Sequence, residues 1–107
     1  MIRITIEKNT DNVKIQSVGH AGFSKDGNDI VCAAVSTLIC TWAQYAVDNL
    51  NVKCMDMKKG YAYIDVEDVN GKAVEPFKML VCGLEALSEQ YFENLHLEWG
   101  EIKKITL

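Results

Sequence analysis

A cysteine and a histidine flank the same predicted junction between a strand and a helix. Cys32 lies three residues after Asp29, a predicted N-cap, and therefore falls in the first turn of a helix expected over 30–50. The unpaired N–H groups and the positive dipole end of a helix N-terminus favour a thiolate over a thiol. His20 ends a predicted strand, and because a strand end and the next helix start can lie close together, its imidazole can reach the sulfur.

Such a pair is suited to acyl transfer. The thiolate attacks a carbonyl carbon, the imidazolium protonates the leaving amine, and N–H groups at the helix start are candidate donors to the oxyanion. From spacing alone the structural interpretation is the more common one: a small side chain packed at a helix start for Cys32, and a polar loop residue for His20. The residues by themselves leave both interpretations open.

The residue order of two sequence motifs favours the catalytic interpretation. Gly-His-Ala-Gly at 19–22, followed by Gly-x-Asp-Ile-Val-Cys-Ala-Ala-Val-Ser at 27–36, resembles the ribosomal-processing cysteine protease family Prp, and the resemblance covers the whole chain in length and element order. It implies a small cytoplasmic bacterial cysteine endopeptidase, homodimeric and without cofactor or metal. Its implied substrate is the N-terminal extension of the large-subunit ribosomal protein numbered twenty-seven. By motif position His20 corresponds to the catalytic histidine and Cys32 to the nucleophile.

The same resemblance assigns further positions to the site. Gly19, Asp29 and Ser36 match positions that line or shape it, and the stretch 22–28, beginning at Gly22, matches a flexible loop that closes over bound peptide. Each has a simpler interpretation. The two glycines can serve backbone geometry alone, Asp29 can cap the helix without orienting His20, and Ser36 can hydrogen-bond back to the carbonyl of Cys32.

Composition limits the partners of the chain. It has 107 residues, a net charge of −4 and a pI near 5.1, and no run of Lys or Arg longer than two. We therefore expect one domain over 1–107 and no nucleic-acid binding. No apolar stretch is expected to reach membrane-spanning length and no signal pattern opens the chain, so we expect a cytoplasmic protein with no membrane partner.

The four cysteines do not form a metal or disulfide pattern. No C-x-x-C pair occurs, and neither histidine stands at zinc-ligand spacing from a cysteine. A cytoplasmic chain with a good core does not need disulfides. We expect Cys40, Cys54 and Cys82 to be reduced side chains of the core.

The apolar periodicity predicts an α+β fold in two layers, with two helices on a mixed or antiparallel sheet in the order ββαββαβ. Trp42 and Trp99 are expected in the core or at a dimer contact, and His96 at an edge or on the surface. The predicted segments are strands over 1–7 and 13–18, an irregular loop over 19–28, a helix over 30–50, two strands within 52–66 turning at Lys59-Gly60, a helix over 76–94 and a strand over 96–106.

Two other functions remain open at this point. A non-catalytic binding factor for the ribosomal protein would use Cys32 only structurally. A thiol redox sensor would use a reactive Cys32 without peptidase activity, although Cys40, two helical turns away, is too distant along the axis to be a good resolving thiol. The expected partner of the protease and of the binding factor is the ribosomal protein.

Overall fold

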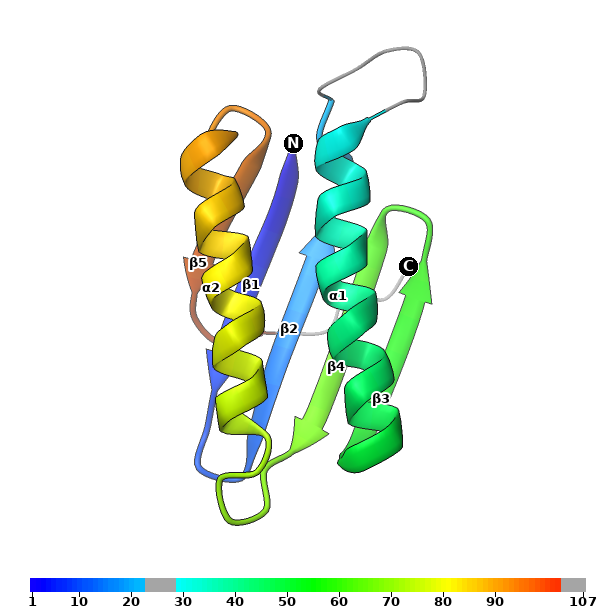
Figure 1. Ribbon diagram of the computed structural model, residues 1–107, viewed down its shortest axis with the longest axis vertical. Coiled ribbons are helices and arrows are strands. Elements are labelled where there is room, and N and C mark those ends of the chain that lie inside the picture. The colour runs from blue at the N-terminus through cyan, green and yellow to red at the C-terminus, as the bar shows by residue number, and fades with distance from the viewer. Residues whose placement is uncertain (23–28, 103–107) are drawn as a thin grey trace.

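Two helices cover one face of a five-stranded sheet in the computed structural model, which describes residues 1–22 and 29–102 (Figure 1). The strands lie in the order β3-β4-β2-β1-β5; β1 and β5 are parallel, and the other neighbours are antiparallel. The predicted order ββαββαβ and the two-layer α+β architecture are confirmed, and the sheet is mixed. The elements are β1 (Ile2–Lys8), β2 (Asn12–Val18), α1 (Ile30–Asn49), β3 (Asn51–Lys58), β4 (Tyr61–Glu67), α2 (Val74–Gln90) and β5 (Leu95–Trp99).

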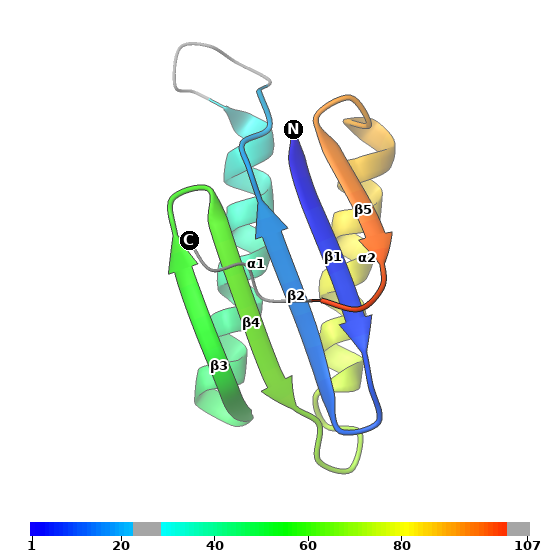
Figure 2. The same ribbon diagram turned by 180° about the vertical axis from the view of Figure 1, so that it is seen from behind.

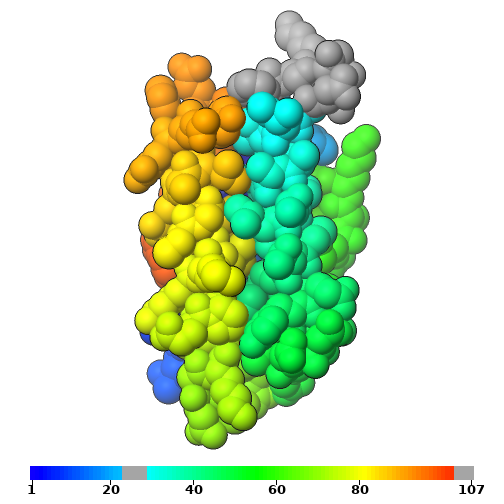
Figure 3. Space-filling view, in the orientation of Figure 1, coloured from blue at the N-terminus to red at the C-terminus, as the bar shows by residue number. Residues whose placement is uncertain are grey.

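The core lies between the helices and the sheet. Alternate residues of the strands point to the helices, so β1 buries Ile2, Ile4 and Ile6 completely or nearly so. Trp42 of α1 meets Phe77 of α2 edge-on, with ring centroids 5.3 Å apart. Figure 3 shows the two helices packed side by side over this face. The predicted core position of Trp42 is therefore confirmed.

The opposite face of the sheet carries a smaller cluster. After β5 the chain turns across this face (Figure 2), and Ile102 is buried against Tyr61 and Tyr63 of β4. The backbone N–H of Ile102 donates to Glu7 Oε1 at 2.6 Å, and that of Gly100 donates to the carbonyl of Ile6 at 3.0 Å. These contacts attach the end of the described chain to the sheet.

Three predictions about the second half of the chain are wrong. The last strand is only Leu95–Trp99, because Gly100 leaves the ladder and the chain crosses the sheet; positions 103–106 of the predicted strand lie outside the described residues. A core position is wrong for Trp99, which is 59% exposed because it ends an edge strand, whereas its place at a dimer contact stays a prediction. α2 begins at Val74 rather than at Pro76. Proline is tolerated in the first turn of a helix because the N–H groups there have no partners within the helix.

α1 also differs from expectation. Its start is less enclosed than its apolar sequence suggests: Ile30 is 56% exposed and Ala33 is exposed, because the helix packs one face on the sheet and its neighbour. By length and composition α1 is apolar enough to cross a membrane, so the expectation that no stretch reaches that length is wrong. A core helix has the same properties, and six residues of α1 are buried in this fold.

The cysteines are free thiols, as expected, but not all of them belong to the core. Cys54 is half-buried beside Tyr61 and Tyr63, whereas Cys40 and Cys82 are exposed. The prediction of a core position is therefore wrong for Cys40 and Cys82. His96 is exposed on the edge strand β5, as predicted.

The contact between Glu7 and Ile102 makes a pH dependence testable. The backbone N–H of Ile102 lowers the pKa of Glu7 below its ordinary value of 4.5. A lowered pKa in the folded state gives stability that is present above pH 4.5 and is lost as the pH falls through the lowered value. Glu7→Gln should therefore reduce the free energy of unfolding at pH 7, measured by urea titration, and the difference from wild type should shrink below pH 4.5. Parallel pH curves for the two proteins would contradict this assignment.

Candidate active site

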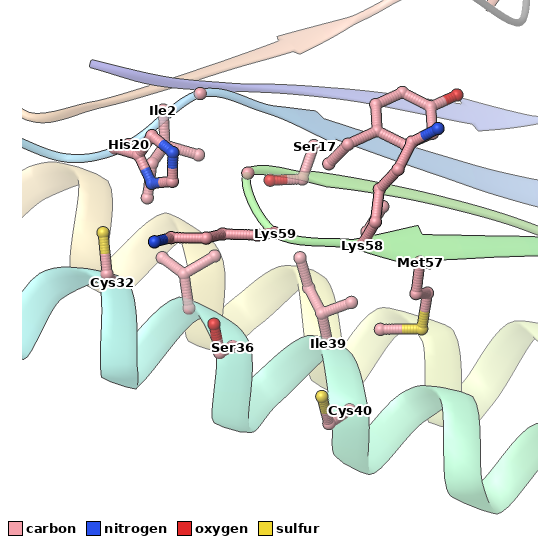
Figure 4. Close-up of a pocket in the computed structure, with 15 residues that line it drawn as sticks. Ile2, Ser17, His20, Cys32, Ser36, Ile39, Cys40, Met57, Lys58 and Lys59 are labelled. Carbon is pink, nitrogen blue, oxygen red and sulfur yellow. The ribbon is translucent and has the colours of Figure 1, made fainter. Parts of the chain in front are cut away.

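One cavity brings together the end of β2, the start of α1 and the β3–β4 turn. Its volume is about 460 Å³, and it lies where the antiparallel pair β3–β4 meets the helix layer. Apolar side chains form its walls, among them Ile2, Val35, Ile39 and Met57. His20, Cys32 and Ser36 face the same space, so the structure brings together three residues that the sequence analysis selected (Figure 4).

Asp29 fixes the helix turn that carries Cys32. Its Oδ1 accepts hydrogen bonds from the N–H groups of Val31 and Cys32, each at 3.0 Å, and its carbonyl accepts from Ala33 at 3.1 Å. The predicted cap is confirmed, whereas orientation of His20 by Asp29 stays a prediction. Because the N–H groups of Val31 and Cys32 already donate to the Asp29 side chain, these two are not free to bind an oxyanion, whereas an oxyanion donor elsewhere at the helix start stays a prediction.

The sulfur of Cys32 has a backbone partner. The N–H of Ala21 donates to Cys32 Sγ at 3.2 Å, and the carbonyl of the same Ala21 accepts a hydrogen bond from Asn94 Nδ2 at 3.1 Å. Ala21 is 2% exposed, so its peptide groups are held in the core while Cys32 itself is half-buried. This chain of contacts orients the thiol toward the cavity and can stabilise negative charge on sulfur.

His20 is positioned by the β3–β4 turn. The N–H of Gly19 donates to the carbonyl of Gly60 at 2.9 Å, which holds the end of β2 against the turn. A Cβ on Gly60 would lie 2.8 Å from His20 Nε2, so the imidazole occupies the space that a side chain would fill. In Figure 4 the imidazole and the sulfur of Cys32 face each other across the cavity. The two side chains that a Cys–His nucleophile requires therefore line the same cavity.

The other predicted site residues lie around this pair. Gly19 has φ +101°, and a Cβ there would lie 2.5 Å from the carbonyl oxygen of Met1, so backbone geometry requires glycine. Gly22 has φ +69° and is exposed with open space around it. The Ser36 hydroxyl is exposed to the cavity and makes no hydrogen bond with residues 1–22 or 29–102. Residues 23–28, the rest of the predicted loop over 22–28, lie outside the described residues.

Three residues of the site are not predicted by the sequence. The sequence predicts Lys59 and Gly60 only as a turn, and Asn94 only as the end of a helix. Gly60 and Asn94 reach the site through contacts with residues 41 and 73 positions away in the sequence, namely Gly19 and Ala21. No local pattern signals such contacts. Within the described part of the chain, no group of three His, Cys, Asp or Glu side chains is placed to hold a metal ion.

Gly60→Ala should displace the His20 imidazole. The new Cβ would meet Nε2 at 2.8 Å, and the residue has φ +74°, which costs a non-glycine residue about 1–2 kcal/mol. Gly71→Ala is a matched control, because Gly71 has φ +76° and nothing within 4 Å of the added Cβ. Both variants should lose similar stability, but only Gly60→Ala should move the NMR resonances of the His20 ring. Equal His20 spectra in the two variants would refute this account.

Asn94→Ala should loosen the Ala21 peptide. The variant removes the donor to the Ala21 carbonyl and should cost about 1 kcal/mol of stability. Exchange of the Ala21 amide proton with solvent should rise about tenfold. Asn49→Ala is the control, since Asn49 makes the same type of bond, from Nδ2 to the carbonyl of Tyr45 at 3.1 Å, at the far end of α1. If the control accelerates Ala21 exchange equally, Asn94 has no specific role there.

Solved structures share this fold. The chain is similar to the essential ribosomal processing protease Prp from Staphylococcus aureus in complex with a covalently linked product peptide, with a TM-score of 0.81 and 24% identity over 94% of this chain and 100% of that one. It is also similar to SMU.848 from Streptococcus mutans, with a TM-score of 0.68 and 28% identity over 92% and 93% of the two chains.

The family assignment rests on the sequence itself. No curated protein matches the chain. The family model described as cysteine protease Prp matches residues 1–96, which include the whole segment with His20 and Cys32. The resemblance of the Gly-His-Ala-Gly and Asp-Ile-Val-Cys segments is thereby confirmed, and the chain belongs to the Prp family of cysteine proteases.

Proposed function

We propose that this protease removes the N-terminal extension of the large-subunit ribosomal protein numbered twenty-seven, with Cys32 as nucleophile and His20 as general base and acid. The observation that carries the proposal is the placement of the Cys32 sulfur, at the capped start of α1, opposite the His20 imidazole across one cavity. The match to the cysteine protease family model supports these two roles, because the matched residues contain both side chains.

The chemistry proceeds in two balanced steps. His20 takes the proton of Cys32, the sulfur bonds to the scissile carbonyl carbon, and the carbonyl electrons move onto oxygen. When they return, the C–N bond breaks and His20 gives its proton to the leaving amine, which becomes a new N-terminus. His20 then takes a proton from water, whose oxygen attacks the thioester carbonyl carbon. The C–S bond breaks, the extension leaves as a carboxylic acid, and His20 returns its proton to the Cys32 sulfur.

An extended peptide suits the cavity. Its walls are largely apolar, with Ile2, Val35, Ile39 and Met57 available to apolar side chains of a substrate. Two structures of the Staphylococcus aureus protease Prp, which match this chain at 20% and 24% identity, contain a substrate peptide and a covalently linked product peptide, which supports a peptide substrate here. The net charge of −4 would also attract a basic ribosomal protein.

The remaining features of the proposal follow from the size and family of the chain. A single domain over 1–107 has little surface from which to build a deep cleft, so we propose that the protein acts as a homodimer, in the cytoplasm. Cofactors are not required by the chemistry above. Family membership supports the protease over a binding factor in which Cys32 is only structural, and over a redox sensor.

The test is cleavage of the extended ribosomal protein, read as product masses. Wild type should release the extension, while Cys32→Ala should abolish cleavage and His20→Ala should reduce kcat by at least about a thousandfold, as loss of a nucleophile or its base does. Cys40→Ala is the control, because Cys40 lines the same cavity but stands two turns beyond Cys32. An intact substrate at saturating wild-type enzyme would exclude the proposed function, and full activity of His20→Ala would exclude the pair.

A further inference from the structure

Three backbone donors near the nucleophile already have partners among the described residues. The N–H groups of Val31 and Cys32 donate to the Asp29 side chain, and the N–H of Ala21 donates to the sulfur itself. Acyl transfer needs a positive or hydrogen-bonding group where charge develops on the carbonyl oxygen, which lies one bond from the carbon that the sulfur attacks. A side chain from another element that reaches the cavity can supply such a group.

Lys59 reaches it from the β3–β4 turn. Its side chain lines the cavity and extends along it, and in Figure 4 the ammonium points toward the end of the cavity that holds His20 and Cys32. Among the described residues no carboxylate forms an ion pair with Lys59; the ion pair found there joins Lys78 to Glu75. Within residues 1–22 and 29–102 the ammonium thus has no ion-pair partner and lines the same cavity as the nucleophile.

The neighbouring lysine is placed differently. Lys58 Nζ lies 5.5 Å from the centroid of the Tyr61 ring, a distance typical of a cation–π contact. Figure 4 shows the two side chains diverging, with Lys59 directed toward Cys32 and Lys58 away from it. Two adjacent residues of the same type therefore differ in their relation to the nucleophile, which makes Lys58 a matched control for Lys59.

We propose that Lys59 is a catalytic residue whose ammonium stabilises the oxyanion formed when Cys32 attacks the scissile carbonyl; this inference rests on the proposed role of Cys32. The S–C bond forms as the carbonyl electrons move onto oxygen, and Lys59 donates a hydrogen bond to that oxygen while keeping its own proton. When the electrons return, the C–N bond breaks and the leaving nitrogen takes its proton from His20, so Lys59 is unchanged over the cycle.

The surroundings strengthen the interaction. Val35 and Ile39 line the same cavity as the lysine, and a bound peptide would displace water from it, so the charge acts through a medium less polar than water. The turn that bears Lys59 is held to β2 by the hydrogen bond from Gly19 to Gly60. The backbone next to Lys59 is thereby fixed relative to His20, which limits the reorganisation needed to reach the oxyanion.

Steady-state cleavage of the extended ribosomal protein separates this role from substrate binding. Lys59→Met should lower kcat and kcat/KM by the same factor, about 10- to 100-fold, with KM unchanged, because the oxyanion exists only in the transition state. Lys59→Arg should recover part of the rate, since it keeps the charge, and Lys58→Met should retain wild-type kinetics. A rise in KM alone, or an equal loss in Lys58→Met, would overturn the proposal.

Alkylation of Cys32 tests the charge without any protease substrate. In a background of Cys40, Cys54 and Cys82 changed to serine or alanine, iodoacetate carries a negative charge to the sulfur and iodoacetamide does not. The rate with iodoacetate divided by the rate with iodoacetamide should fall at least about threefold in Lys59→Met at low salt and stay constant in Lys58→Met. An unchanged ratio in Lys59→Met would overturn the inference even if wild type cleaves its substrate. A fallen ratio with no cleavage by wild type would place the failure in the proposed function and retain the charge beside Cys32.

Discussion

The side chain and carbonyl of Asp29 decide what the rest of the site must supply. By accepting hydrogen bonds from the N–H groups of Val31, Cys32 and Ala33, this one residue fixes the first turn of α1 and with it the position of the nucleophile. The same bonds occupy two of the N–H groups that a helix start would otherwise offer to a negative charge. Placement of Cys32 therefore uses backbone donors of the site, which is why a cationic side chain from another element matters for the proposed chemistry.

Sheet topology brings those groups to Cys32. Because β2 is the central strand in the order β3-β4-β2-β1-β5, its end lies between the β3–β4 turn on one side and the start of β1 on the other. Gly19 binds the turn through Gly60, whereas Ala21 is held by Asn94, whose own carbonyl accepts a hydrogen bond from Ile2. The segment with His20 is thus attached to both halves of the sheet, and neither half alone could hold the imidazole opposite the sulfur.

The parts of this arrangement that the sequence predicted are those with a local signal. Period-two and helical apolar patterns gave the order of elements, the Asp29 cap follows from its spacing to Cys32, and the Gly-His-Ala-Gly segment carried the family resemblance. The contact of His20 with Gly60 has no such signal, because it depends on strand pairing across 40 positions of sequence. The exposed positions of Cys82 and Trp99 were missed for a related reason: an apolar residue type does not show whether a neighbouring element covers it.

The charge of the protein acts on two length scales with opposite signs. The whole chain is acidic, with a net charge of −4, which at physiological ionic strength attracts a basic partner over roughly the 8 Å Debye length from its surface. Inside the cavity, however, the charged side chains that line it are Lys58 and Lys59, beside the ionisable His20. A uniformly acidic surface would repel the negative charge that forms on a carbonyl oxygen during acyl transfer. The proposed role of Lys59 therefore places a cation at the cavity of an acidic chain, where it can stabilise the anion that forms beside the sulfur.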